Sequence, residues 1–173
     1  MKVLVIFDQI QAGLGGKENP DLPLGGKMMA IGSASMLEPA LKPVNGKIVS
    51  TLYCGDGFFE ANKLEVTKKV IALVKKVNPD VVICGPAYNY KGYAAMCAVL
   101  AKAINKYTDI PAISAMSQEN DETIATYKDV IDIVKMPKKG GTGLNESLRH
   151  ICELASKKAN KEDVTEYTKQ VCY

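Results

Sequence analysis

A run of apolar residues followed directly by a polar, aromatic loop, between Asp80 and Tyr93, constrains the fold more than any other stretch. Residues 81–84 are apolar and mostly β-branched, which is typical of a strand buried on both faces of a parallel sheet. Gly85 and Pro86 end this strand, and the loop after them leads into a helix. Because ligands of open α/β sheets bind at the carboxyl ends of the strands, this loop is a candidate binding segment.

The rest of the chain repeats the same alternation of strand and helix. Strand patterns recur in five segments, Lys2 to Phe7, Lys47 to Cys54, Val81 to Cys84, Ile110 to Met116 and Val130 to Val134. Helix patterns or boundary signals recur at 27–38, 59–77, 92–107, 121–126 and 144–159. With right-handed crossovers, this order predicts a three-layer α/β/α sandwich of flavodoxin-like or Rossmann-like type. Its mostly parallel, five-stranded sheet is expected in the strand order 2-1-3-4-5.

Length and composition favour one domain with a sizeable core. The chain has 173 residues, of which 47% are apolar and 24% are charged. We expect a single α/β domain over residues 1–159 and a polar tail over residues 160–173, which can dock as a short helix against this chain or a partner. A net charge of +3 does not indicate nucleic acid. No run is apolar enough for a membrane span, and the first residues resemble a strand more than a secretory signal, which favours the cytoplasm.

The cysteines and the single histidine do not have metal-site spacing. The chain has five cysteines and no Cys-x-x-Cys pair, so we expect free thiols, no metal and no cofactor bound by this chain. Cys54 differs from the others because it ends a predicted strand and precedes Gly55 and Asp56. It is therefore a weak catalytic candidate beside the expected crevice.

Polar residues follow several predicted strands, and a shared sheet edge would bring them together. Asp8, Asp56 and Glu119 carry carboxylates that can act as general bases or bind a substrate amine, and the last two are weak catalytic candidates. Gln9, Tyr88 and Asn89 lie in the same loops. These residues can equally serve as loop and cap residues.

Of two glycine-rich segments, only the second is a candidate for contacts with an anion. Residues 12–18, in a long loop from Asp8 to Gly26, resemble a phosphate loop but have neither the Gly-Lys-Ser/Thr ending nor a Gly-x-Gly-x-x-Gly pattern. Gly141, Thr142 and Gly143 open the last main helix, where backbone N–H groups can hold an anion. A turn with Thr142 as the helix N-cap explains the second segment equally well.

Four motifs, at 9–18, 54–59, 85–93 and 110–120, together resemble the selenoprotein B family, the component B subunits of glycine, sarcosine and betaine reductases. The resemblance implies an oxidoreductase of anaerobic amino-acid fermentation that cleaves a carbon–nitrogen bond reductively. In that family a pyruvoyl group on a sister subunit engages the amine of some substrates, and a selenocysteine attacks the α-carbon. The carboxymethyl group then passes to selenoprotein A.

This chain departs from the family in the region that carries the selenocysteine. None of its cysteines matches that residue, position 17 is a lysine where an acidic residue is expected, and the tail after Ala159 does not continue the pattern. The resemblance therefore implies a component B module that shapes part of a pocket for a small amino acid or N-methylated amine. The pyruvoyl group and the selenocysteine are expected on partner chains or in the missing region. The implied substrate-binding residues are Asp8, Gln9, Gly15, Gly16, Glu18, Asp56, Tyr88, Asn89 and Glu119.

Two other classes of function stay open on the sequence alone. One is a flavodoxin-like redox or nucleotide-binding protein, against which the incomplete phosphate loop counts. The other is a non-catalytic interaction subunit that uses the loop from Tyr88 to Tyr93 and the tail as its contact surface.

Overall fold

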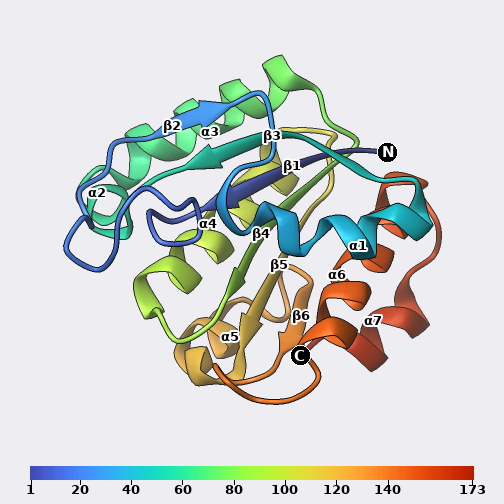
Figure 1. Ribbon diagram of the computed structural model, residues 1–173. Helices are drawn as coiled ribbons and strands as arrows, with labels where there is room; N and C mark the ends of the chain where they lie inside the picture. Colours follow the sequence, from blue (N-terminus) through green and yellow to red (C-terminus); the bar gives the residue numbers. More distant parts are fainter.

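Six strands form one sheet in the order β2-β3-β1-β4-β5-β6 in the computed structural model, which describes residues 1–173 (Figure 1). The strands are β1 (Lys2–Phe7), β2 (Gly25–Lys27), β3 (Lys47–Tyr53), β4 (Val81–Ala87), β5 (Ala112–Ser117) and β6 (Ile133–Met136). All neighbouring pairs are parallel except β2 with β3. Apart from β2, which the sequence did not predict, the strands follow the predicted order 2-1-3-4-5.

Helices cover both faces of this sheet, which confirms the predicted α/β sandwich (Figure 1). One face carries α2 (Asp56–Ala61), α3 (Lys63–Val77), α4 (Lys91–Tyr107) and α5 (Asp121–Tyr127). The other carries α1 (Glu38–Leu41), α6 (Leu144–Ala159) and α7 (Thr165–Val171). Short 3-10 helices lie at Gly32–Met36, Lys42–Val44 and Gln118–Asn120. No helix is both long and apolar enough to cross a bilayer.

The two central strands are buried on both faces, as their sequences predicted. In β1, Leu4 and Ile6 join the hydrophobic cluster under α3 and α4, whereas Val3 and Val5 join the cluster under α1 and α6. Every residue of β4 is buried. All five cysteines are buried free thiols, which confirms that part of the sequence analysis.

The helix predicted at 27–38 is wrong. Gly25–Lys27 forms β2, and the chain reaches α1 only after the 3-10 helix. The glycines explain the difference, because a Cβ on Gly25 would lie 2.5 Å from the Tyr53 hydroxyl and one on Gly26 would lie 2.7 Å from Leu52. Residues without side chains can thus approach β3 closely enough to pair with it. Pro39 does not stop this helix but lies in the first turn of α1, where its missing N–H costs nothing.

Three further boundaries differ from the sequence analysis. Gly85 and Pro86 do not end the central strand, because β4 continues through them to Ala87. The helix predicted at 59–77 is two helices, α2 and α3, divided at Asn62. The division changes the helical phase, so Val66, Val70 and Val74 are buried while Leu64 is 71% exposed. The last strand begins at Ile133 and not at Val130, because the N–H groups of residues 130 and 131 donate to the carbonyl of residue 127 and close a turn. It is an edge strand, as expected.

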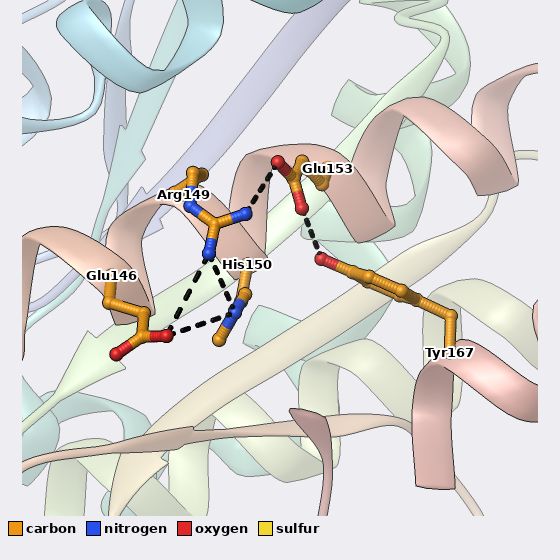
Figure 2. Close-up of polar contacts among 5 residues, drawn as sticks. All are labelled: Glu146, Arg149, His150, Glu153 and Tyr167. Carbon is orange, nitrogen blue, oxygen red and sulfur yellow. Dashed lines mark hydrogen bonds and ion pairs between the residues drawn. The ribbon is translucent and has the colours of Figure 1, made fainter. Parts of the chain in front are cut away.

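The polar tail forms α7, which packs against α6 and β6 of its own chain. Figure 2 shows the contact, in which the Tyr167 hydroxyl donates to Glu153 at 2.5 Å while Arg149 pairs with the same carboxylate at 2.9 Å. Arg149 and His150 both face Glu146 one turn earlier on α6. A single bridge between Val134 and Cys172 then places the end of the chain beside β6.

A buried hydrogen bond between α4 and β1 yields a stability prediction. The Tyr93 side chain is fully buried, and its hydroxyl donates to the Ile6 carbonyl at 3.0 Å. Tyr93→Phe removes this donor and is expected to lower the free energy of unfolding by about 1–2 kcal/mol in urea titrations. Tyr107→Phe is the control, because Tyr107 is 54% exposed and its variant is expected to unfold like the parent. Equal stabilities of the two variants would contradict this prediction.

Candidate functional site

The loops that follow β1 and β3 meet at the carboxyl edge of the sheet. The Gln9 side chain donates to the Asp56 carboxylate at 3.2 Å, and the Asp56 N–H donates to the Gln9 side-chain oxygen at 3.4 Å. The long loop continues past them, where the Gly55 N–H donates to the Leu22 carbonyl at 2.8 Å. Residues 47 positions apart in the chain are thus held in direct contact, as the parallel-sheet prediction required.

Asp8 lies at the end of β1, and its side chain is almost completely buried. Burial raises the pKa of its carboxyl from 3.8 to about 6, and the nearby Asp56 carboxylate adds to this effect. The Gln11 N–H, which donates to Asp8 at 2.6 Å, opposes the shift. A carboxyl with this pKa can take up or release a proton close to neutral pH, as a general base must.

Asp56 lies against the first turn of α4. A Cβ on Gly92 would be only 2.5 Å from a carboxylate oxygen of Asp56, so the glycine leaves room for this contact. Carboxylates are favoured at helix N-termini, where backbone N–H groups carry partial positive charge. Asp56 thus lies half-buried at the start of α4, next to Asp8.

The loops after β4 and β5 are joined by a residue that the predicted site did not include. The amide of Asn120 donates to the Tyr88 carbonyl and, at 3.1 Å, to the Ser117 carbonyl. Its side-chain oxygen is buried and has no partner in this chain, and the same is true of the Tyr88 hydroxyl. Because buried polar atoms without partners are rare, both are candidates for ligand contacts. Asn89 is exposed beside them.

Basic side chains surround Tyr90 at the rim of the same edge. The ammonium groups of Lys17 and Lys139 lie 5.2 Å and 6.0 Å from the centre of the Tyr90 ring. The nearby Glu119 carboxylate accepts hydrogen bonds from the Ser117 hydroxyl at 3.1 Å and from the backbone N–H of Lys139 at 3.4 Å. Sequence reasoning did not assign Lys17, Tyr90 or Lys139 to the site, because only the folded loops bring them together.

The glycine-rich loop after β1 is closed on itself and does not form a phosphate cradle. The N–H groups of residues 12–14 donate to carbonyls of residues 8–10, and that of Gln11 donates to Asp8. The Glu18 carboxylate accepts a hydrogen bond from the Gly16 N–H at 2.8 Å. Hydrogen bonds from the backbone N–H groups of Glu18 itself and of Gly16 lower the pKa of this carboxyl. A Cβ on Gly15 would collide with Asn19, so both glycines serve the tight turn. This arrangement disfavours a flavodoxin-type phosphate site.

Two other predicted site features have different surroundings. Cys54 is buried, and burial raises the pKa of its thiol to about 12, so it has the environment of a core thiol and not of a nucleophile. At the start of α6 the N-cap is Gly143 and not Thr142, with no side-chain cap. The exposed N–H groups there stay candidates for an anion. No group of three His, Cys, Asp or Glu side chains converges as a metal site would require.

The predicted binding residues form a packed cluster of loops, and none of the five larger hollows of the molecule lies among them. Hollows of about 330 to 590 Å³ lie elsewhere, for example between α1 and α6 and between β2 and α3. Most of the predicted residues share one edge, but they leave little free volume between them. These residues of this chain can therefore form one side of a binding site but do not enclose a ligand by themselves. We call this cluster of loops the wall.

Comparisons with known proteins agree with this arrangement of motifs. The family model described as glycine/sarcosine/betaine reductase selenoprotein B matches residues 1–172. The chain is 29% identical over 163 residues to the glycine reductase complex component B subunit gamma of Carboxydothermus hydrogenoformans, covering 94% of this chain and 37% of the relative. A subunit of the same name from Symbiobacterium thermophilum is 33% identical over 120 residues, covering 69% and 28%.

A relative from a second reductase is equally similar. The sarcosine reductase complex component B subunit beta of Peptoclostridium acidaminophilum is 29% identical over 162 residues, covering 94% of this chain and 36% of the relative. The chain thus spans about a third of the length of the curated relatives it matches.

The buried Asp8 carboxyl generates a pH prediction. Because its pKa is raised to about 6, its contribution to stability is full below pH 3.8 and is lost as the pH rises through 6. Asp8→Asn stays neutral, so its stability relative to the parent is expected to rise by about 2 kcal/mol between about pH 4.5 and 7.5. Urea titrations at both pH values measure this change, and a difference independent of pH would contradict it.

Proposed function

Because the chain belongs to the glycine/sarcosine/betaine reductase selenoprotein B family, we propose that it is a component B subunit or module whose loop cluster forms part of a substrate pocket. The substrate is a small amino acid or an N-methylated amine, and the reaction is the reductive cleavage of its carbon–nitrogen bond. The observation that carries the proposal is the gathering of Asp8, Gln9 and Asp56 at one edge of the sheet, beside two buried polar atoms without partners.

The charged and polar groups of this cluster of loops suit different parts of such a substrate. The Asp8 and Asp56 carboxylates lie inside the cluster and attract a cationic amine, which they can hold in a partly dry environment. The unpartnered oxygens of Tyr88 and Asn120 accept N–H groups of the same ligand. Lys17 and Lys139 at the rim attract the substrate carboxylate. This order of charges suits a zwitterion that enters with its amine first.

The bond-breaking groups are expected from other parts of the assembly. A selenolate, which the family supplies from a selenocysteine, is an ionised nucleophile at neutral pH. None of the buried thiols of this chain matches it, and burial keeps the Cys54 thiol protonated. The residues of this chain bind and orient the substrate and keep the amine charged, so that the α-carbon faces the nucleophile of a partner. A cytoplasmic oxidoreductase complex of anaerobic amino-acid fermentation is the setting that the proposal implies.

Purification from the native host tests the assembly. A tagged chain is expected to co-purify with a pyruvoyl-containing polypeptide and a selenium-containing polypeptide, which mass spectrometry identifies. Recovery of a chain that binds flavin and no such partner would overturn the proposal.

Two substitutions test the wall of the pocket. Asp56→Asn keeps the size of the side chain but removes its charge, and Asn89→Ala removes an exposed amide from the loop after β4. In the assembled complex, Asp56→Asn is expected to lower kcat/KM by about 10-fold or more, since a charge-assisted contact is lost, and Asn89→Ala to lower it less. Asp109→Asn, at the opposite edge of the sheet, is the control and is expected to keep the parent kinetics. Unchanged kinetics in both test variants would remove these residues from the pocket.

A further inference from the structure

The edge strand β2 leaves one side of its backbone without a partner. It stands at the end of the strand order and pairs with β3 alone, through Gly25–Tyr53, Gly26–Leu52 and Lys27–Thr51. In Figure 1 it lies at the rim of the sheet, with α3 behind it. Outward N–H and C=O groups of such a strand can pair with another strand. Two of its three residues are glycines, so no bulky side chain shields this backbone.

A groove of about 590 Å³ runs between β2, the adjoining part of β3 and the end of α3. The partly exposed side chains of Leu73 and Val77 supply apolar surface along it, above the buried Leu52. Met28, which lines the groove, is 72% exposed, and the following Met29 is 59% exposed. Flexible methionines are common at surfaces that bind other polypeptides. The exposed backbone and the apolar groove thus lie side by side.

The charges of the groove are all of one sign. Lys27 and Lys76 line it, and no acidic residue does. Both lysines are exposed, and neither forms an ion pair with a carboxylate of this chain. A second copy of the chain, paired β2 to β2 about a two-fold axis, would bring four lysines together. The charges therefore disfavour self-association and favour an acidic occupant.

We infer that this groove binds an extended, acidic segment of another polypeptide, which adds a strand to the sheet beside β2. The backbone of that segment pairs with β2, its apolar side chains contact Leu73 and Val77, and its carboxylates meet Lys27 and Lys76. The chain spans about a third of relatives that are named as subunits of complexes, which is consistent with a partner chain at this edge. The inference does not depend on the substrate pocket, because the groove lies along the flank of the sheet and not at its carboxyl edge.

Model peptides test this inference on the full chain. The probe is a blocked peptide that alternates valine and glutamate, compared with one that alternates valine and lysine and with an N-methylated form of the glutamate peptide that cannot donate backbone hydrogen bonds. In amide-resolved NMR titrations, only the first peptide is expected to shift the signals of Gly26, Met28 and Lys76. Slower amide exchange in β2 is expected on saturation.

Charge reversal supplies the matched comparison. The double variant Lys27→Glu, Lys76→Glu is expected to have an affinity for the glutamate peptide that is lower by about 5-fold or more. It is expected to bind the lysine peptide instead. Lys68→Glu, on an exposed position of α3 outside the groove, is the control and is expected to bind like the parent.

Three results would overturn the inference. The first is the absence of shifts in β2 at millimolar glutamate peptide. The second is equal binding of the N-methylated peptide, since backbone pairing would then play no part. The third is a dimer of the parent chain in sedimentation that Met28→Glu dissociates, because a second copy would then occupy the groove.

Discussion

Burial of β1 and β4 on both faces of the sheet is the constraint on which the rest of the structure depends. Two hydrophobic clusters, one under α3 and α4 and one under α1 and α6, lie on opposite faces of the sheet, and alternating side chains of both strands contribute to each cluster. Their parallel pairing forces the loops after them to emerge at the same edge. The parallel pairing of β1 with β3 likewise brings the loop after β3 to this edge, where Asp56 contacts Gln9 and lies near Asp8.

The candidate site combines a buried acidic interior with a basic rim. Burial keeps Asp8 partly protonated near neutral pH, while the half-buried Asp56 lies against the first turn of α4. Lysines 17 and 139 remain in solvent around Tyr90. Two neighbouring carboxyls in different environments can divide the tasks of proton exchange and charge pairing, which is a common arrangement in catalytic sites. The family membership gives this arrangement a chemical context without locating the bond-breaking groups in this chain.

The sequence predicted the features that are set by local pattern and missed those that are set by tertiary contact. The apolar run of β4 and the helical spacing of α6 were sufficient to predict the sheet centre and a helix at 144–159. The segment at 27–38 was mispredicted because the close approach of Gly25 and Gly26 to β3 leaves no trace in local periodicity. The same reason applies to the site. Polar residues after strands could be named, but the unpartnered oxygen of Asn120 depends on how the loops after β4 and β5 pack.

The two edge strands of the sheet, β2 and β6, differ in whether other residues of the chain pair with their outer side. Beside β6, the chain's own last residues pair with Val134 and with the carbonyl of Ile133, so that side is capped from within. No other segment of the chain pairs with the outer side of β2. Unpaired edge strands can recruit strands of other chains, and a strand added at an edge has an outer edge of its own. The pairing at residues 172 and 173 occupies part of the β6 edge, so recruitment of another strand is favoured on the β2 side of the sheet.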